Sequence, residues 1–369
     1  MIQRHIRILE LGITLRGPRE VVEPLAFAYR RFSVDDPGAG ATCIELDGSD
    51  SGVVVIDGRP ADLIPDLEIG RQLYHYLLIT LMDGIGSHAL LHAAALRTRD
   101  GSALLLAAPS GYGKTSLTLE LAHRGLGFMG DDYAPLDLDL RQMLPYPRAV
   151  GIILDGESRI PRPFRDHAGR PGAVKLFGKT LVDVGQVLGE ASLVTEPVPL
   201  RRIVLLSSEE AASGTFPTRV LVVGRGAHAD ELHNFFAGTA GIEILERRDR
   251  PHLAVWSLRL EHQASPTEAL SRVLDSDKVV FAEKHWEATP DFSGSPRATP
   301  VRRREAAELL GREMLNRRGR GKLLARHGNN VTELFVHLAG ALREASCWRV
   351  RVGNYRETVD LVESLADQK

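Results

Sequence analysis

Apolar and polar residues alternate along the first part of the chain, which predicts short strands separated by turns. The strand-like runs are Ile6–Leu9, Thr42–Leu46 and Val53–Ile56. Between Leu67 and Met82 the apolar residues instead recur every three or four positions, which is the spacing of an amphipathic helix. We therefore expect residues 1–86 to form a small N-terminal α+β domain.

The middle of the chain, residues 87–283, has the strand–turn–helix rhythm of an α/β domain. Its run Ala103–Ala108 is continuously apolar, as in a strand that is buried on both faces. A glycine-rich turn and a predicted helix, Lys114–Arg124, follow this run, and Gly125 is well suited to end that helix. Further apolar runs that predict strands are Leu126–Gly130, Ile203–Leu206, Val220–Val223 and His252–Leu258.

The last part of the chain begins with a change in composition. Residues 289–300 are rich in Pro, Ser and Gly, and we place a linker at 284–300. Residues 301–369 are then expected to form a mainly helical C-terminal extension. Within it, the stretch Arg302–Arg326 holds nine Lys and Arg residues against three glutamates, a local excess of six positive charges. The sequence further predicts a helix near Val331–Glu344, a strand near Trp348–Val352 and a helix from Tyr355 onward.

Composition narrows the class of protein. Of the 369 residues, 43% are apolar and 25% are charged, which is enough to bury a core and excludes wholesale disorder. The formal charge of −2 argues against a globally basic surface, so a nucleic-acid partner is not expected. Cys43 and Cys347 lie far apart, which excludes a disulfide framework and a zinc site made of several thiolates. Charged residues interrupt the apolar N-terminus, and no apolar run is long enough to span a bilayer, so we expect a cytoplasmic protein without a membrane partner.

A phosphate-binding loop is the strongest chemical signal. Ala108-Pro-Ser-Gly-Tyr-Gly-Lys-Thr115 satisfies the pattern G-x-x-x-x-G-K-[ST] except at its first position, where alanine stands. Glycines allow a tight turn whose backbone N–H groups point inward, and the N-terminus of the following helix favours an anion. Lys114 would reach the β- and γ-phosphates of a nucleotide, and the Thr115 hydroxyl would ligate Mg²⁺. The expected nucleotide-binding residues are Ser110, Gly111, Tyr112, Gly113, Lys114, Thr115 and Ser116.

Two neighbouring carboxylates, Asp131 and Asp132, follow the next predicted strand. Ligands bind at the carboxyl ends of strands in an open α/β sheet, and a kinase needs carboxylates for the metal and for the proton of the attacking hydroxyl. A bare Asp-Asp pair is more often an acidic turn, but its position seventeen residues after Lys114 favours the functional interpretation.

His92 and Arg148 are weaker candidates. His92 opens a strand-like stretch, and a hairpin through Asp100-Gly101 would bring it beside the phosphate-loop strand. Arg148 is an isolated cation before an apolar run. Taken alone, His92 is more simply interpreted as a structural histidine, and Arg148 as a surface arginine.

Together these four elements resemble the HPr kinase/phosphorylase superfamily and its diverged relatives. The matching pieces are His92–Leu96, Pro109–Thr115, Gly130–Tyr133 and Arg148–Ile153, in the same order. The resemblance covers residues 90–154 well and the rest to about 280 in outline. It implies an α/β fold with a P-loop core similar to that of HPr kinase and of the phosphoenolpyruvate carboxykinases.

The same resemblance implies roles for the residues of the site. Asp131 would be the general base, Thr115 and Asp132 would serve the metal, and His92 would lie near the transferred phosphoryl group. Arg148 falls in the loop that approaches the phosphates and the substrate. Tyr146 stands where that loop carries a glutamate in true HPr kinases, which speaks against HPr as the substrate and against the reverse reaction. Diverged relatives include kinases that phosphorylate a serine of a ribosomally made peptide, and family members often form rings, so a homo-oligomer is compatible with the resemblance.

We therefore expect a Mg²⁺-dependent kinase that moves the γ-phosphoryl group of ATP or GTP to a hydroxyl, with a serine of a peptide or small protein as the leading acceptor. A small-molecule hydroxyl kinase is one alternative, and a P-loop ATPase or nucleotide-gated regulator is another. Such ATPases usually place a Glu after the metal-binding Asp, whereas Asp132 stands here. The stretch Arg302–Arg326 is either a solvated helix face or a docking surface for an acidic acceptor.

Overall fold

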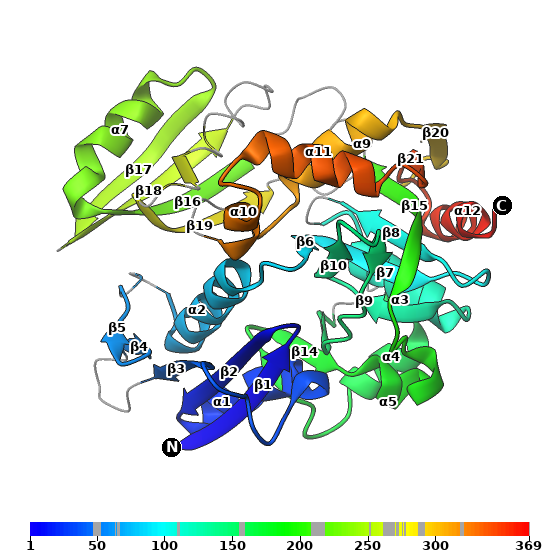
Figure 1. Ribbon diagram of the computed structural model, residues 1–369, viewed down its shortest axis with the longest axis horizontal. Coiled ribbons are helices and arrows are strands. Elements are labelled where there is room, and N and C mark those ends of the chain that lie inside the picture. Colours follow the sequence, from blue (N-terminus) through cyan, green and yellow to red (C-terminus); the bar gives the residue numbers. More distant parts are fainter. Residues whose placement is uncertain are drawn as a thin grey trace. The chain divides into compact units, whose positions relative to one another are not determined.

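The computed structural model describes residues 1–46, 53–62, 64, 67–108, 111–154, 159–207, 218–250, 252–260, 270, 273–274, 276, 278–286, 292–317 and 321–368. The protein has a mixed α/β fold (Figure 1). Contacts within the chain divide it into two compact units. The first consists of Met1–Ala61, Leu73–Ser207 and Phe292–Lys369, and the second of Asp62–Gln72 and Ser208–Asp291. No helix in the described ranges is both long and apolar enough to cross a bilayer.

A five-stranded sheet opens the first unit, in the order β1-β2-β3-β4-β5. Its strands are β1 (Ile2–Ile8), β2 (Leu11–Gly17), β3 (Thr42–Leu46), β4 (Val54–Ile56) and β5 (Arg59–Pro60). Alternate residues of β1 and β2 are fully buried (Ile6, Ile8, Ile13 and Leu15), which is the period of a strand with one apolar face. Helix α1 (Arg19–Ala28) follows β2, and a 3-10 turn (Arg30–Phe32) follows α1. Leu9 has a φ of 53°, so the first strand turns there rather than including Leu9 as the sequence suggested.

Helix α2 (Ile69–Gly84) confirms the helical spacing expected for Leu67–Met82. Its buried residues Leu73, Leu77 and Leu81 recur every four positions, so they lie on one face of the helix.

The central sheet carries the predicted phosphate loop. Its main path runs β6-β10-β11-β15-β8-β7-β9, and β21 joins it by pairing with β15 and β20. The strands are β6 (Ala89–Leu91), β7 (Ala93–Arg97), β8 (Ala103–Ala107), β9 (Gly127–Gly130), β10 (Ala134–Asp137), β11 (Gln142–Met143), β15 (Val198–Ser207), β20 (Arg297–Pro300) and β21 (Ser346–Arg351). The pairs of β15 with β8 and with β21 are parallel, and β7 and β8 form the antiparallel hairpin expected through Asp100-Gly101.

Every residue of β8 is buried, as its unbroken apolar run predicted. Ala103, Leu105 and Ala107 belong to a core cluster that also contains residues of the C-terminal helices, among them Leu310 and Leu338. Those helices are α9 (Arg303–Arg312), α10 (Lys322–Arg326) and α11 (Val331–Ala341). Helix α3 (Lys114–His123) packs on β7, β8 and β9, and α12 (Tyr355–Asp367) packs on β15 and α3.

The C-terminal segment is thus built into the central sheet. β21 and α12 lie close to where the sequence predicted a strand and a helix. Residues 297–300, inside the segment expected to be a linker, form strand β20 on the edge of β21. A strand at a sheet edge tolerates the proline at position 300 because the backbone N–H that it lacks is not needed on the open side.

A smaller sheet, β12-β14-β13, completes the first unit. Its elements and the helices beside it are β12 (Val150–Ile152), α4 (Arg162–Ala168), β13 (Lys175–Leu176), β14 (Lys179–Val182), α5 (Val184–Leu188) and the 3-10 turn Glu190–Ser192. Buried Asp183 caps α5 and receives two hydrogen bonds from Arg31, of 2.6 and 2.8 Å. This ion pair joins the N-terminal sheet region to the smaller sheet.

The second unit contains a four-stranded antiparallel sheet in the order β17-β18-β16-β19. Its elements are β16 (Thr218–Arg225), a 3-10 turn (Gly226–His228), α7 (Ala229–Gly238), β17 (Ile242–Arg250), β18 (Leu253–Leu260) and β19 (Val279–Trp286). Leu232 and Phe236 of α7 pack with Val222 and Trp256 of the sheet in a core of its own.

Candidate functional site

Two glycines in the described part of the loop between β8 and α3 have backbone conformations that are used in tight turns. Gly111 and Gly113 have φ values of 86° and 77°, which side chains rarely adopt, although a Cβ at either position would meet only open space. Gly113 is also the N-cap of α3, where no side chain caps the first N–H groups. Ala108 is not among the described residues with positive φ, so alanine is tolerated there. Ser110, which we expected to bind nucleotide, lies outside the described residues.

Lys114 is the first residue of α3 and places a cation inside the protein. Its side chain is 7% exposed, and within the described part of the chain its Nζ atom has no hydrogen-bond partner. Burial lowers the pKa of Lys114, although Asp132, Asp131 and Glu313 act in the opposite direction. A buried, unpartnered ammonium is costly unless an anion joins it, so this atom points to an anionic ligand.

Asp131 lies in the turn after β9 and is 2% exposed. The Thr115 hydroxyl is 3.5 Å from its Oδ2 atom, while its Oδ1 atom has no hydrogen-bond partner in the described structure and lies 4.0 Å from Nε of Arg148. Burial, with the charge of Asp132, raises the pKa of Asp131 to about 7. A carboxyl group that gains and loses its proton near neutral pH is suited to general acid–base work.

Asp132 is the more exposed neighbour, with 32% of its side chain accessible, and it forms an ion pair with Nη2 of Arg148. Burial alone would raise the pKa of Asp132, but Arg148, Lys114 and His92 together lower it to about 2. Asp132 is therefore a permanent carboxylate of the kind that Mg²⁺ prefers. The Thr115 hydroxyl contacts Asp131 rather than Asp132, so the two residues that we expected to share the metal are not joined by a direct contact.

Arg148 connects the two aspartates with the surrounding aromatic side chains. Its Nη1 atom donates to the hydroxyl of Tyr74 at 3.0 Å, and its guanidinium lies 5.0 Å from the ring centroid of Tyr133. Tyr146 anchors the segment before it, because the Tyr146 N–H donates to the carbonyl of Met129 at 2.6 Å. Arg148 is thus largely enclosed, with 11% of its side chain exposed, and is not the surface residue of the simpler interpretation.

His92 lies between β6 and β7, and its partner comes from the C-terminal segment. Its backbone N–H donates to the Glu313 carbonyl at 2.8 Å, and its Nδ1 atom is 3.2 Å from a carboxylate oxygen of Glu313. Leu315 N–H donates to the Leu90 carbonyl at 2.8 Å, and the side chain of buried Asn316 accepts from Leu90 N–H at 2.9 Å. These bonds hold residues 313–316 against the strand that leads into the site.

Direct contacts therefore join Thr115, Asp131, Arg148 and Asp132 in one cluster. Lys114 and His92 lie close enough for their charges to lower the pKa of Asp132. Tyr112 is buried in the loop, and the carbonyl of Ser116 accepts a hydrogen bond from the Tyr355 hydroxyl of α12 at 3.0 Å. Sequence reasoning missed Glu313. It stands among arginines, 221 residues from His92, and no local pattern marks it.

The donor set fits a Mg²⁺–nucleotide. Among the described residues, Nζ of Lys114, Oδ1 of Asp131 and Nε of Arg148 are buried polar atoms without a hydrogen-bond partner. Two cationic groups suit phosphate oxygens, and carboxylate and hydroxyl oxygens suit Mg²⁺. The geometry thus offers partners for both components.

Comparisons with known proteins found a weak structural likeness. No protein-family model matches the chain, and no curated protein does. Among solved structures, the chain is similar to the Hpr(Ser) kinase/phosphatase from Coxiella burnetii, with 20% sequence identity and a TM-score of 0.24 over 33% of this chain and 67% of that one. A TM-score this low indicates neither a shared fold nor a shared function.

Proposed function

We propose that the protein is a phosphotransferase that moves the γ-phosphoryl group of ATP or GTP to a hydroxyl group. The observation that carries this proposal is the buried, unpartnered Lys114 Nζ atom at the start of α3, next to two aspartates of unlike pKa. Pairs of titratable groups whose surroundings separate their pKa values are typical of acid–base sites.

In this proposal the loop from Gly111 to Thr115 holds the phosphates by its backbone N–H groups, and Lys114 neutralises the charge of the β- and γ-phosphates. Asp132 and the Thr115 hydroxyl would hold Mg²⁺, which when bound lowers the repulsion between the phosphate charges and the incoming oxygen. Arg148, which is paired with Asp132, and His92, which is paired with Glu313, would contact the transferred group.

Asp131 would take the proton. As the acceptor oxygen forms its bond to phosphorus, the bond between phosphorus and the leaving nucleoside diphosphate breaks, and the hydroxyl proton passes to the carboxylate of Asp131. The pKa of about 7 makes the deprotonated form available at neutral pH while retaining a substantial affinity for the proton.

The leading acceptor remains a serine of a peptide or small protein, with a small-molecule hydroxyl as the alternative. One observation favours a docking role for the stretch Arg302–Arg326: residues 313–315 within it pair with the backbone next to His92. Arg303 and Arg312 of α9 are exposed and could bind an acidic acceptor. Glu313 follows Arg312 and contacts His92, so an acceptor bound there would lie near the site. An ATPase without an acceptor is the competing function.

The test combines binding and turnover. Lys114→Ala should abolish nucleotide-dependent activity by weakening nucleotide binding, whereas Asp131→Asn should remove transfer and leave nucleotide affinity within a few-fold of wild type. Lys175→Ala and Asp166→Asn are matched controls, because both residues are exposed and lie outside the cluster.

Nucleotide affinity would be measured by titration calorimetry, and transfer by the mass increase of candidate acceptors in the presence of Mg²⁺. Wild-type turnover in Asp131→Asn would contradict the assignment of the base. ATP consumption that does not depend on any acceptor would favour the ATPase.

A further inference from the structure

Two histidines and a glutamate meet on the C-terminal helices, away from the residues assigned to phosphoryl transfer. They are His327, Glu333 and His337, and their potential ligand atoms all lie within 4.8 Å of one another. The two imidazole rings are 4.6 Å apart between centroids and inclined at 64°. Nothing in the proposed reaction uses these three residues.

The local backbone fixes the three side chains relative to one another. Glu333 and His337 are four residues apart on α11, so they share one face of the helix. His327 follows α10 in a tight turn that includes Gly328 and Asn329, both with positive φ. Asn330 closes the turn by donating its N–H to the His327 carbonyl at 3.0 Å, and its side chain caps α11. Because the turn and the cap are both hydrogen-bonded, His327 is held against the first turns of α11.

We propose that His327, Glu333 and His337 bind a divalent transition-metal ion, with Zn²⁺ as the representative of the class. Two imidazoles and one carboxylate are a common zinc ligand set, and water would complete a tetrahedron. At Zn–N distances of about 2.0–2.1 Å, tetrahedral ligand atoms lie roughly 3.3 Å apart. The present separations need to close by about 1.5 Å at most, which rotations of the exposed Glu333 side chain and of the His337 side chain can supply. Imidazole ligands disfavour Mg²⁺, so this site would not compete for the metal of phosphoryl transfer.

Binding there would have a structural consequence. The ion would join the end of α10 to α11, and α11 packs on α9. Helix α9 leads directly to Glu313, the residue that contacts His92. The metal would thus stabilise the segment that supplies Glu313. The metal proposal itself does not depend on the proposed kinase activity.

The experiment uses the full chain without an affinity tag, freed of metal with a chelator and dialysed. Zn²⁺ would be titrated in competition with a chromophoric chelator, and Co²⁺ binding would be followed by its visible d–d absorption. We expect one equivalent of tightly bound Zn²⁺, an intense tetrahedral Co²⁺ spectrum, and a rise in the melting temperature on adding Zn²⁺ because the ion binds the folded state.

His337→Gln and Glu333→Gln remove one ligand each and should weaken Zn²⁺ binding roughly 100-fold or more, with loss of the thermal shift. Glu333 is exposed, so Glu333→Gln remains informative if His337→Gln fails to fold. His228→Gln is the matched control, since His228 forms a similar histidine–glutamate pair with Glu231 at 3.4 Å. Equal Zn²⁺ affinity in the wild type and both ligand variants would overturn the proposal, as would an octahedral Co²⁺ spectrum.

Discussion

Two neighbouring carboxyl groups in the candidate site hold their protons at very different pH values. Asp131 is enclosed and keeps one oxygen without a hydrogen bond, whereas Asp132 is partly exposed and paired with Arg148. Burial and the charge of Asp132 raise the pKa of Asp131, whereas the positive charges of Arg148, Lys114 and His92 lower the pKa of Asp132. An enclosed carboxylate costs free energy that the fold must supply elsewhere, which is a common feature of functional sites.

This cost predicts a pH-dependent stability. The pKa of Asp131 is raised in the folded state to about 7, from a usual value of about 3.9 in the unfolded chain. Between these values the folded state binds the proton and the unfolded state does not, so stability falls as pH rises and levels off above pH 7. Asp131→Asn removes this dependence. Between pH 5 and pH 8, the variant should gain about 2–3 kcal/mol in unfolding free energy relative to wild type.

Urea unfolding of the nucleotide-free proteins at several pH values measures this difference. Asp166→Asn, at an exposed position on α4, should follow the wild-type curve. Parallel curves for wild type and Asp131→Asn would mean that Asp131 is ionised throughout this range.

For single residues, the sequence predicts those features of the site that depend on a local pattern. Gly111, Gly113 and Lys114 are recognisable because the turn needs glycine backbones and the anion needs a lysine. The pKa separation of the two aspartates is not recognisable, because it depends on enclosure by distant segments. Glu313 is likewise invisible in the sequence, since only pairing of residues 313–315 with residues 90–92 brings it to His92.

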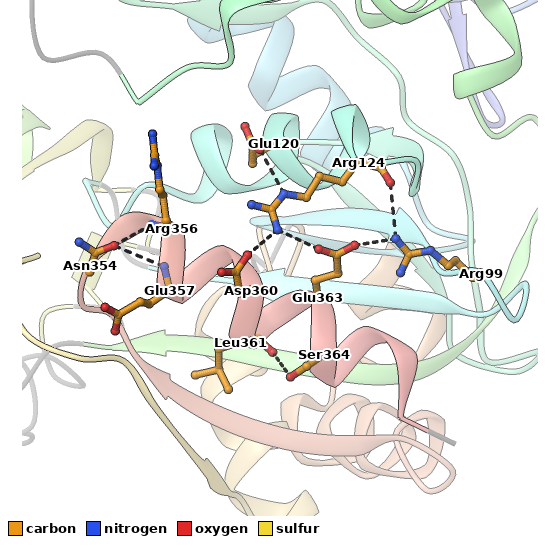
Figure 2. Close-up of polar contacts among 10 residues, drawn as sticks. All are labelled: Arg99, Glu120, Arg124, Asn354, Arg356, Glu357, Asp360, Leu361, Glu363 and Ser364. Carbon is orange, nitrogen blue, oxygen red and sulfur yellow. Dashed lines mark hydrogen bonds and ion pairs between the residues drawn. The ribbon is translucent and has the colours of Figure 1, made fainter.

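Among the elements, α12 shows how the end of the chain is attached to the helix that follows the phosphate loop. Figure 2 shows Arg124, which follows the last residue of α3, reaching Asp360 and Glu363 of α12, while Arg99 reaches Glu363 from the other side. These distances are 2.6, 2.9 and 2.5 Å. Beneath the charges, Val359, Val362 and Leu365 are buried. The attachment thus has an exposed ionic layer and an apolar layer.

We expect the apolar layer to contribute more to stability. Val362→Ala should lower the free energy of unfolding by about 2 kcal/mol, because it removes two buried methyl groups and leaves a cavity. Glu363→Gln should cost about 1 kcal/mol or less, because the ion pairs of Glu363 with Arg99 and Arg124 are partly exposed to solvent, and the cost should shrink in high salt. Urea midpoints at low and high salt measure both effects, with Glu357→Gln at the exposed start of α12 as the control. A larger cost for Glu363→Gln than for Val362→Ala would reverse this ranking.

The bounds of helices and strands agree with the prediction where the apolar pattern that marks them is local and continuous. The buried strand β8, helix α3 and helix α2 lie close to the predicted ranges for this reason. The strand that pairs with β21 could not be predicted from the sequence in this way. Its parallel partner β15 is more than a hundred residues away, and period-2 alternation indicates a strand without indicating its neighbour.

At the level of the whole molecule, the candidate site lies within one of the two compact units. Every described residue of the candidate site belongs to the first unit, and none of the described residues between 208 and 291 is in the central core cluster. The second unit has a separate core around Trp256. Residues 208–291 form the larger part of the second unit, whose other part is Asp62–Gln72, and the chain on both sides of residues 208–291 belongs to the first unit.

This division predicts that residues 208–291 can be replaced by a short linker. Val352 N–H donates to the Ser207 carbonyl at 2.9 Å, and Asn354 N–H donates to the Gly294 carbonyl at 2.6 Å. Val352 and Asn354 are only two positions apart, which limits their separation to about 7 Å. Ser207 and Gly294, near the two ends of the segment, are hydrogen-bonded to them and therefore lie near each other. A linker of about six Gly and Ser residues can close this span at a small entropic cost.

The shortened chain should fold and bind nucleotide with an affinity within about threefold of the full chain, since the loop, Lys114 and both aspartates keep their surroundings. Circular dichroism and titration calorimetry measure fold and affinity, and the shortened chain with Lys114→Ala controls for non-specific binding. Loss of acceptor phosphorylation with unchanged nucleotide affinity would assign acceptor recognition to the second unit. A folded chain that no longer binds nucleotide would contradict the separation, because it would mean that the phosphate site depends on residues outside the first unit.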